Sequence, residues 1–226
     1  MAVNYRRDAE AAEATVKEVE RLGRRAIAVG ADVSDLAACE AMVARVLDEL
    51  GPPSILVHNG GIASRGNSVV DTDPDELDRV VRTHAYGGFN LAKLVVPHMA
   101  GQPRGDVVMI SSVATDGLSA NGAPYNMGKA ALEALAMTLA KEVQGKGIHV
   151  NVVAPGLVAT DMGDRLTKAM TGGAAQAAHD LDSRAPFGHV CTPEDVAGVV
   201  RFLVSDHAGY VSGVRIRVDG GGSVLR

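Results

Sequence analysis

Apolar and polar residues follow two different periods along this chain, and the two periods alternate. Short apolar runs are typical of buried strands, and longer stretches with an apolar residue every three or four positions indicate amphipathic helices. The predicted strands cover residues 2–5, 26–29, 54–58, 106–111, 148–154 and 213–218. The predicted helices cover residues 9–22, 35–50, 74–98, 124–144 and a last segment that begins after Thr192. Strands that alternate with helices in this way predict an α/β fold with a parallel sheet.

Capping residues mark where several of these helices begin. Ser34 is the expected N-cap of the second helix, because a serine side chain accepts a hydrogen bond from a free backbone N–H of the first turn. Asp73 followed by Pro74 opens the third helix, and Thr192 followed by Pro193 opens the last one. Proline is favoured at the first helical position, so both pairs support the predicted helix starts.

The composition is that of an ordinary globular protein. Of the 226 residues, 46% are hydrophobic, and the net charge is −5 with Lys and Arg dispersed. This length predicts one domain over residues 1–226, and the charge pattern argues against nucleic acid or an anionic membrane as a partner. No apolar stretch approaches the roughly 20 residues that span a bilayer. The first residues show no apolar signal region, which predicts a cytoplasmic protein.

Cysteine and histidine give no sign of a disulfide framework or a metal site. Cys39 and Cys191 are the only two cysteines in the sequence, and Cys39 falls on a predicted helix face, where it is expected to be a small buried side chain. The seven histidines are scattered. No metal site is therefore predicted.

The spacing of Ser112, Tyr125 and Lys129 carries the most chemical information. Residues i and i+4 share one face of a helix, so Lys129 is expected beside Tyr125. A positive charge about 4 Å away is worth about 4 kcal/mol to a phenolate, which would lower a phenol pKa from about 10 toward 7. Ser112 ends a strand that faces this helix, whereas strand alternation turns Ser111 to the other face. The three side chains suit carbonyl reduction or alcohol oxidation.

A Tyr-x-x-x-Lys pair also occurs on exposed helices, so the surrounding segments decide its meaning. One strand runs into glycines at residues 55–61, another runs into residues 155–160 (Pro-Gly-Leu-Val-Ala-Thr), and the last ends in residues 218–221 (Val-Asp-Gly-Gly). These segments, in this order around Ser112, Tyr125 and Lys129, resemble the short-chain dehydrogenase/reductase family, most closely its 3-oxoacyl-[acyl-carrier-protein] reductase-like members. The resemblance extends over nearly the whole chain and implies a Rossmann-like, doubly wound parallel sheet.

The resemblance implies roles for four side chains. Tyr125 would donate a proton to the substrate carbonyl, Ser112 would orient the carbonyl oxygen, and Lys129 would acidify the phenol and bind the nicotinamide ribose. His84 stands where the family has an asparagine that organises a water beside the lysine. An imidazole can donate and accept, so His84 would serve as a relay that titrates near pH 6.5. The alternative is that His84 is a structural core histidine.

The resemblance also implies a nicotinamide cofactor. NAD-preferring relatives carry an acidic residue at the end of the second strand, whereas Tyr5, Arg6 and Arg7 stand there in this chain. An arginine suits the 2′-phosphate, so NADP(H) is expected in preference to NAD(H). The alternative is that both arginines are merely solvated. The other residues implied to contact the cofactor are Asp32, Val33, Asn59, Gly60, Gly61, Tyr125, Lys129, Pro155, Gly156, Val158 and Thr160.

One part of the family pattern is absent from the sequence. The family opens with a strand, the turn Thr-Gly-x-x-x-Gly-x-Gly and a helix, whereas residue 2 enters at the family's second strand. One βα unit of roughly 30 residues is missing, and with it the glycine turn that approaches the pyrophosphate. Two inner strands are therefore expected to lack a partner. The chain is either a fragment of a longer reductase or a complete short protein whose sheet closes up or borrows a strand.

The residues leave three functions open. The first is NADPH-dependent reduction of a 3-oxoacyl thioester or a similar ketone, as in fatty acid biosynthesis. The second is dehydrogenation of sugars, polyols or ring alcohols; the expected substrate lid, residues 161–191, would discriminate it from the first. The third is a non-catalytic family member that acts through oligomer contacts. The resemblance implies a homo-tetramer or homo-dimer formed by the helices near 85–100 and 124–144 and the last strand.

Overall fold

The strands of this protein run parallel to their neighbours but form two sheets. The computed structural model describes residues 1–222, and its sheets have the orders β1-β2 and β3-β4-β5-β6. The strands are β1 (Ala2–Tyr5), β2 (Ile27–Gly30), β3 (Ile55–His58), β4 (Gly105–Ile110), β5 (Ile148–Pro155) and β6 (Arg215–Val218). Ala2 lies opposite Ile27 in the small sheet, and Val107 lies opposite Val150 in the large one. The predicted α/β fold with parallel strands is confirmed.

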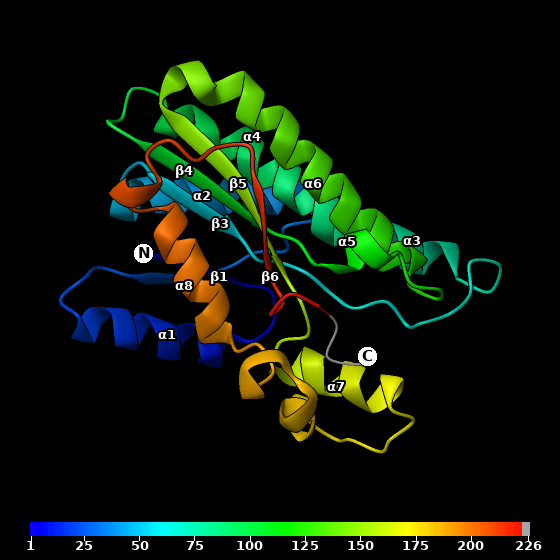
Figure 1. The fold of residues 1–226 in the computed structure, drawn as a ribbon. Helices are drawn as coiled ribbons and strands as arrows, with labels where there is room; N and C mark the ends of the chain where they lie inside the picture. Colours follow the sequence, from blue (N-terminus) through cyan, green and yellow to red (C-terminus); the bar gives the residue numbers. More distant parts are fainter. Residues whose placement is uncertain (223–226) are drawn as a thin grey trace.

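Helices cover both faces of the four-stranded sheet (Figure 1). The helices are α1 (Ala9–Arg21), α2 (Leu36–Leu50), α3 (Pro74–Val81), α4 (Gly87–Met99), α5 (Ala114–Gly117), α6 (Ala123–Val143), α7 (Asp161–Met170) and α8 (Pro193–Leu203). The helices α4 and α6 pack on one face, and α8 packs on the other against β4, β5 and β6. The small sheet is covered by α1, and α2 packs against α4.

The central strands β4 and β5 form the core. Val107, Val150 and Val152 are fully buried and pack toward α4 and α6, while Val108 and Val153 face α8. A parallel strand with helices on both faces must be apolar on both, which is why these strands are continuous apolar runs in the sequence. Burial of each such side chain contributes about 1.5–3 kcal/mol. The carboxyl ends of β4 and β5, where the predicted site lies, are therefore firmly held.

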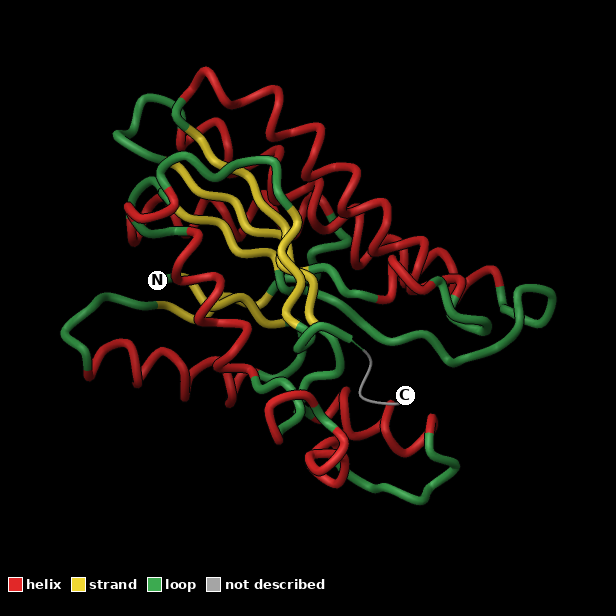
Figure 2. The backbone as a smooth tube through the Cα atoms, in the orientation of Figure 1, coloured by secondary structure: helices red, strands yellow, loops and turns green. Residues whose placement is uncertain are grey.

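The break between the two sheets lies between β1 and β3, where the resemblance predicts a missing strand. Its effect is seen at β3, which has exposed apolar side chains although its sequence is typical of a buried parallel strand. Ile55 is 45% exposed and Val57 is 41% exposed. Figure 2 shows the small sheet set apart from the four-stranded one. Among residues 1–222, the expectation that inner strands lack a partner is confirmed.

Side chains, not strand pairing, connect the small sheet to the large one. A cluster of buried residues, here named the N-terminal cluster, consists of Val29, Ala31, Val33, Cys39, Met42 and Leu91. Leu56 of β3 packs against it. Asn90 Nδ2 of α4 donates a hydrogen bond to the backbone O of Val33 at 3.0 Å. The expected burial of Cys39 is confirmed, because its side chain is fully enclosed.

The helix predicted over residues 74–98 is interrupted. The chain forms α3, then a π-helical turn η1 (Arg82–Tyr86), and then α4, which ends at Met99. A π turn inserts one residue into the helix, and such turns are frequent at functional sites. Apolar periodicity hardly registers a single inserted residue, which is why the sequence predicts one continuous helix.

Other boundaries move by a few residues. Asp35 rather than Ser34 caps α2, and its carboxylate accepts hydrogen bonds from two backbone N–H groups of the first turn. The Ser34 hydroxyl instead donates to Asp32 at 2.6 Å. The last strand begins at Arg215 rather than at residue 213, because Gly213 has a φ of 71°, which is incompatible with an extended strand.

The expected lid segment is mostly helical. It contains α7 and two 3₁₀ segments, η3 (Ala178–Arg184) and η4 (Pro186–Gly188). Leu181 and Val190 are buried in it and pack against Leu157, which follows β5. Its function as a lid stays a prediction. Across residues 1–222, none of the helices has the length and apolar character needed to cross a membrane.

Candidate active site

Two serines follow β4 and point to opposite sides. Ser111 is buried and donates a hydrogen bond to the Glu133 carboxylate of α6. Ser112 Oγ accepts a hydrogen bond from the Ala114 N–H at 3.1 Å, and its side chain hydrogen-bonds Tyr125. Strand alternation separates the two serines as predicted, and Ser112 is the one that reaches the tyrosine.

Tyr125 and Lys129 lie one turn apart near the start of α6. Lys129 is buried, and its Nζ donates a hydrogen bond at 2.7 Å to the backbone O of Ile110, the last residue of β4. The same Nζ lies over the Tyr125 ring, 5.8 Å from the ring centre. The lysine charge is thus anchored to the end of β4 and held against the aromatic ring.

Burial dominates the acid–base properties of this pair. It raises the pKa of Tyr125 above its ordinary value, and the hydrogen bond with Ser112 opposes this effect only in part. Burial also lowers the pKa of Lys129 to about 8, with the Glu133 carboxylate acting in the opposite direction. The expected lowering of the Tyr125 pKa is therefore wrong for this structure. The ammonium group is bound to the Ile110 carbonyl, and desolvation of the phenol outweighs its attraction.

The π turn η1 brings His84 to the same place. Its ring meets the Tyr125 ring edge-on, with 5.2 Å between ring centres and an angle of 81°. His84 Nε2 lies 2.8 Å from the backbone O of Ile62. A carbonyl only accepts, so Nε2 carries the proton and Nδ1 is the acceptor. Nδ1 is buried and has no hydrogen-bond partner within residues 1–222.

His84 does not titrate where the sequence suggested. Burial, followed by the charge of Lys129, lowers the pKa of His84 to about 3. The expected relay that titrates near pH 6.5 is therefore wrong, and His84 is a neutral imidazole at physiological pH. Gly61 lies against both side chains: a Cβ added to it would lie 2.7 Å from His84 Cε1 and 3.5 Å from Lys129 Nζ. Only glycine fits there without displacing His84.

The turn after β5 holds several residues expected at the nicotinamide end of a cofactor. The Gly156 N–H donates to the backbone O of Val218 at 2.9 Å, which ties the turn to β6. Val158 forms an isolated parallel bridge with Cys191. Thr160 caps α7, and its Oγ1 accepts a hydrogen bond from the Gly163 N–H at 3.2 Å. The threonine that the sequence singled out thus has a structural role of its own.

The residues expected at the adenosine end follow β1 and β2. Arg6 and Asp32 form an ion pair of 3.9 Å, and both side chains are more than a third exposed. A hydrogen bond from Ser34 is the main cause of the lowered pKa of Asp32; desolvation opposes it, and the charges of Arg6 and Arg7 contribute less. The arginine that would bind a 2′-phosphate is therefore already paired with a carboxylate, and the pair is open to solvent.

Four other expected cofactor residues differ in their surroundings. Asn59 is exposed. Val33 is buried in the N-terminal cluster, so its side chain serves packing. A Cβ on Gly60 would lie 3.1 Å from the ring of His58, so a side chain there would crowd the histidine. Tyr5 packs over the end of β2, within 3.2 Å of where a Cβ of Gly30 would lie.

These residues fit the two ends of a dinucleotide but not its middle. Tyr125, Lys129 and the turn after β5 lie at the carboxyl ends of β4 and β5, and Arg6 lies just after β1. Ligands of open α/β sheets bind outside the carboxyl ends of the strands. The pyrophosphate of such a ligand is held at a strand-to-helix turn. Within residues 1–222 no strand, and hence no such turn, lies between β1 and β3.

His58 belongs to the site, although the sequence did not single it out. It is buried, and its Nε2–H donates a hydrogen bond to the backbone O of His84 at 3.1 Å. This bond holds the π turn that carries His84. Burial lowers the pKa of His58 to about 4. A histidine inside an apolar strand, directly before Asn59, was a signal that could have found it.

A polar network behind the site was also missed. Arg215 Nε of β6 donates to the Glu133 carboxylate at 2.8 Å, and Arg215 Nη2 donates to the backbone O of Ser112 at 3.0 Å. Arg215 also forms an ion pair of 3.1 Å with Asp116. Glu133 follows Lys129 by four residues, so the helical spacing that links Tyr125 to Lys129 extends to it. The network fixes the segment that carries Ser112.

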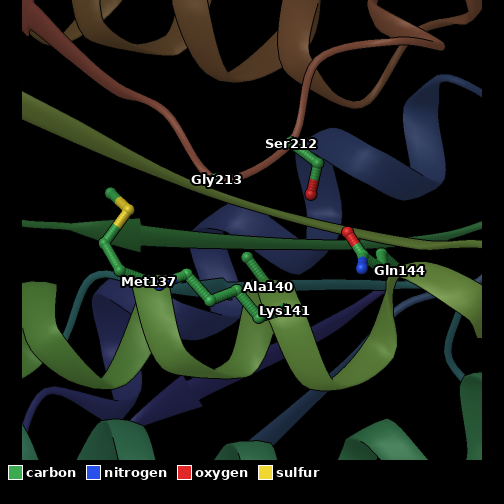
Figure 3. Close-up of a pocket in the computed structure, with 6 residues that line it drawn as sticks. All are labelled: Met137, Ala140, Lys141, Gln144, Ser212 and Gly213. Carbon is green, nitrogen blue, oxygen red and sulfur yellow. The ribbon is translucent and has the colours of Figure 1, made fainter.

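A hollow of about 430 Å³ lies elsewhere, between α6 and the chain before β6. Figure 3 shows the residues that line it, which are Met137, Ala140, Lys141, Gln144, Ser212 and Gly213. Met137, Ala140 and Lys141 belong to the second half of α6, Gln144 follows that helix, and Ser212 and Gly213 precede β6, whereas Tyr125 and Lys129 belong to the start of α6. The hollow contains none of the predicted site residues and is not part of the candidate active site.

Comparisons with known proteins agree with this geometry. Residues 1–223 match the family profile described as enoyl-(acyl carrier protein) reductase. The chain is 34% identical over 221 residues to the 3-oxoacyl-[acyl-carrier-protein] reductase FabG of Staphylococcus aureus, covering 98% of this chain and 87% of that protein. The chain belongs to the short-chain dehydrogenase/reductase family.

Solved structures of other short-chain dehydrogenases/reductases share the fold. A short-chain dehydrogenase from Burkholderia cenocepacia in complex with NADP is 32% identical, with a TM-score of 0.83, and covers 97% of this chain and 86% of that one. A 7α-hydroxysteroid dehydrogenase complexed with NADH and 7-oxo glycochenodeoxycholic acid is 28% identical, with a TM-score of 0.87, and covers 98% and 84%. The resemblance inferred from the sequence is confirmed, and this short-chain dehydrogenase/reductase is an oxidoreductase.

Proposed function

We propose that this protein reduces a ketone to a hydroxyl group with NADPH as the hydride source, and that a 3-oxoacyl thioester is its substrate. The observation that carries this proposal is the assembly of Ser112, Tyr125, Lys129 and His84 around one buried point at the end of β4. The substrate class is supported by the similarity to the 3-oxoacyl-[acyl-carrier-protein] reductase of S. aureus.

Tyr125 is the proton donor in this proposal. Its raised pKa keeps the phenol protonated at neutral pH, which is the state that a donor needs. Ser112 hydrogen-bonds the phenol, so a substrate oxygen bound by both hydroxyls is held where its negative charge develops. Tyr125 gives its proton to that oxygen, and the charge of Lys129 over the ring stabilises the phenolate that forms.

His84 keeps the role of a relay, but as a hydrogen-bond acceptor instead of a titrating group. Its Nε2–H is committed to Ile62, and its Nδ1 accepts. Lys129 lies near it: a Cβ added to Gly61 would lie 3.1 Å from His84 Nδ1 and 3.5 Å from Lys129 Nζ. After Tyr125 has given up its proton, Lys129 can supply a replacement to the phenolate, and His84 Nδ1 can accept a hydrogen bond from the group that then reprotonates Lys129.

NADP(H) is the cofactor that we propose in preference to NAD(H). Arg6 and Arg7 follow β1, and an arginine binds a phosphate through its planar fork of N–H groups. Binding would require Arg6 to exchange its exposed partner Asp32 for the 2′-phosphate. When bound, the cofactor supplies the hydride. The residues proposed to hold its nicotinamide end are Lys129, Pro155, Gly156, Val158 and Thr160.

The proposal is tested by following NADPH oxidation with a 3-oxobutanoyl thioester as the substrate. Tyr125→Phe removes the donated proton and is expected to lower kcat at least about 100-fold while leaving the circular dichroism spectrum unchanged. Tyr210→Phe is the matched control, because Tyr210 is fully exposed and far along the chain from the site. Equal turnover by the Tyr125→Phe variant and the unaltered protein would show that the phenol is not the donor.

A dehydrogenase of ring alcohols is the second candidate. The observation that favours it is the fold similarity to the 7α-hydroxysteroid dehydrogenase, together with the buried apolar cluster of the lid segment around Leu181 and Val190. The same assay, run with NADP⁺ and a hydroxysteroid or a polyol, separates the two candidates. Absence of turnover in all of these assays, from folded protein, would favour a non-catalytic family member.

We also propose that the protein is a homo-oligomer, a tetramer or a dimer. Phe89 of α4 and Met127 of α6 are each about half exposed, at 51% and 52%, on the helices that the family resemblance associates with subunit contacts. Light scattering on the purified chain measures the mass directly. A monomer at all micromolar concentrations would contradict this part of the proposal.

A further inference from the structure

The connection between β3 and α3 passes directly beside the candidate active site. Its residues 59–68 form neither helix nor strand, and Figure 1 shows the connection in cyan, running out from the end of β3 before it turns back into α3. A Cβ on Gly61 would lie 2.7 Å from His84 Cε1. The backbone O of Ile62 accepts the hydrogen bond from His84 Nε2–H at 2.8 Å. This is the first point at which a side chain holds the connection.

Glu76 of α3 holds the same connection at a second point. The Arg65 N–H donates a hydrogen bond at 2.5 Å to Glu76 Oε1. Glu76 is only 3% exposed, and its Oε2 has no hydrogen-bond partner within residues 1–222. A buried carboxylate is costly unless it is hydrogen-bonded, and hydrogen bonds to ionised oxygens are the stronger ones. The bond from Arg65 therefore stabilises a side chain that is otherwise shut off from water.

The place of Glu76 on its helix does not explain this contact. Glu76 stands three residues after Asp73, the N-cap of α3, where a glutamate can reach back to the N-cap N–H. Its carboxylate binds the Arg65 N–H instead. The Arg65 guanidinium adds little, because its Nε lies 3.8 Å from Glu76 Oε2 and the Arg65 side chain is 66% exposed. The specific contact is thus the one with the backbone of the connection.

Both points of attachment belong to one helical body. The helix α3 and the π turn η1 follow one another without a gap, and both pack against α6. Residues 62–65, here named the clamped segment, are tied by Ile62 to His84 of η1 and by Arg65 to Glu76 of α3. Only two residues separate Ile62 from Arg65, so a displacement of Arg65 is passed on to the Ile62 carbonyl.

The Ile62 carbonyl decides which nitrogen of His84 carries the proton. It lies 2.8 Å from Nε2, closer than the Ile62 N–H at 3.4 Å, and a carbonyl only accepts. The proton is therefore on Nε2, and Nδ1, next to Lys129, is left as the acceptor. If the carbonyl were displaced, water would reach the ring and both neutral forms of the imidazole would be populated.

We propose that Glu76 is a positioning residue: by binding the Arg65 N–H it holds the clamped segment in place, and through Ile62 it fixes the protonated nitrogen and the orientation of His84. Glu76 acts on the reaction only through His84. Its effect on turnover rests on the proposed function, whereas its effect on the His84 ring does not.

Nuclear magnetic resonance of the protein with ¹⁵N-labelled histidine tests this directly. The chain has seven histidines, and His84→Asn identifies the His84 signals by their loss. In the unaltered protein the His84 proton is expected on Nε2, and the ring signals are expected to stay constant from about pH 8 to about pH 5, because the imidazole is buried. In Glu76→Ala, a mixture of both neutral forms is expected, and the ring is expected to titrate above about pH 5.

Three further variants separate the hydrogen bond from the charge. Glu76→Gln keeps an acceptor oxygen at the same reach and is expected to preserve the His84 signals of the unaltered protein. Glu76→Asp keeps the charge but is one methylene shorter, so it is expected to behave like Glu76→Ala. Asp75→Ala is the matched control, because Asp75 is an exposed acidic residue of the same helical turn. It is expected to change nothing at His84.

The same bond is tested from the donor side, which keeps the test valid if Glu76→Ala does not fold. Arg65→Pro removes the backbone N–H and is expected to release His84, whereas Arg65→Ala keeps the N–H and is expected to leave His84 unchanged. Signals from a single neutral form in the folded Glu76→Ala or Arg65→Pro variant would overturn the proposal. So would an equal release by Arg65→Ala, because the guanidinium would then hold the segment.

Kinetics supply the second readout. In NADPH-dependent ketone reduction, Glu76→Ala is expected to lower kcat roughly 10-fold with an unchanged KM for NADPH, and Glu76→Gln is expected to restore it. A raised KM with an unchanged kcat would contradict a positioning role. If the unaltered protein shows no turnover, the proposed function fails, while the resonance experiment still decides whether Glu76 positions His84.

Discussion

Three titratable side chains share one buried region beside Tyr125, and all three are shifted toward their neutral forms. Burial lowers the pKa of His58 to about 4, of His84 to about 3 and of Lys129 to about 8. The charges reinforce this, because Lys129 further lowers the pKa of both histidines. Lys129 is thus the one positive charge of this group at neutral pH, and it has a single backbone carbonyl, that of Ile110, as its hydrogen-bond partner within the described residues.

The two histidines make the protein sensitive to acid. Above pH of about 6.5 they are neutral in both the folded and the unfolded chain, and they contribute no pH dependence. As the pH falls from about 6.5 toward 4, the two histidines bind protons in the unfolded chain but stay neutral in the folded chain. The free energy of unfolding is therefore expected to fall by up to about 1.4 kcal/mol per pH unit for each histidine.

Urea unfolding at a series of pH values measures this slope. His58→Asn is expected to flatten it, whereas His98→Asn, at an exposed histidine, leaves it unchanged. If the free energy of unfolding depended on pH in the same way in the His58→Asn variant and in the unaltered protein, His58 would not be buried in its neutral form.

Lys129 sets the upper pH limit of the reduction in the proposed function. Its pKa of about 8 means that the charge is present below this pH and lost above it. The rate of ketone reduction is therefore expected to decline as the pH rises through about 8. Glu133 raises the pKa of Lys129, so Glu133→Gln should move the decline to lower pH. Glu142→Gln, on the exposed side of the same helix, is the control. If the rate declined at the same pH in both variants, a group other than Lys129 would control the decline.

Close approach between elements explains several glycines. A Cβ on Gly87 would lie 2.7 Å from Val33, and one on Gly88 would lie 2.5 Å from Leu132, so α4 sits closer to its neighbours than a side chain allows. The tightest case is Gly163 in the first turn of α7, where a Cβ would lie 1.9 Å from the backbone O of Val158. The start of α7 is thus fixed against the turn that follows β5.

Gly163→Ala is expected to destabilise the protein by roughly 1–3 kcal/mol, because backbone cannot give way as a flexible side chain does. Gly198→Ala is the matched control: it also places alanine in a helix, α8, but meets no atom within 4 Å. It is expected to stabilise by roughly 0.5–1 kcal/mol. Thermal unfolding of both variants compares them directly, and a stable Gly163→Ala variant would mean that α7 starts differently in solution.

The order of strands and helices could be predicted from hydrophobic periodicity because β4, β5 and α6 have strong and uninterrupted patterns. The spacing of Ser112, Tyr125 and Lys129 likewise placed the three side chains together. The π turn could not be predicted because apolar periodicity hardly registers one inserted residue. The hydrogen bond from His58 to His84 and the Arg215–Glu133 pair could not be predicted because each joins segments that are distant in sequence. The direction of the Tyr125 pKa shift failed for the same reason: helical spacing gives the neighbour, but only the packed structure shows how much water is excluded.

At the scale of the whole molecule the chain consists of two pairing units held together by side chains. The β1-α1-β2 unit meets the four-stranded sheet mainly through the N-terminal cluster and the hydrogen bond from Asn90 to Val33. No strand pairing among residues 1–222 joins the two sheets. The stability of the first unit therefore depends on one small apolar cluster, whereas the second has the larger core around β4 and β5.

Met42→Ala tests this division. Met42 is 7% exposed in the N-terminal cluster, and truncation of such a side chain costs about 2–5 kcal/mol. Hydrogen exchange is expected to accelerate in β1 and β2 while β4 and β5 keep their protection. Met99→Ala, at a fully buried methionine of the larger core, is expected to weaken β4 and β5 instead. Uniform acceleration in both variants would show that the two sheets unfold as one.

The break in the sheet also has a mechanical consequence. Strands of a continuous sheet resist a pulling force in shear, because many backbone hydrogen bonds must rupture together. Here a force applied at Met1 reaches β4 and β5 mainly by way of apolar contacts, such as those of Leu56 with the N-terminal cluster, and the single hydrogen bond from Asn90 to Val33. Apolar contacts yield gradually and over short extensions. Pulled from its first residue, this protein would therefore release the β1-α1-β2 unit at low force, and the four-stranded sheet would rupture later as a separate event.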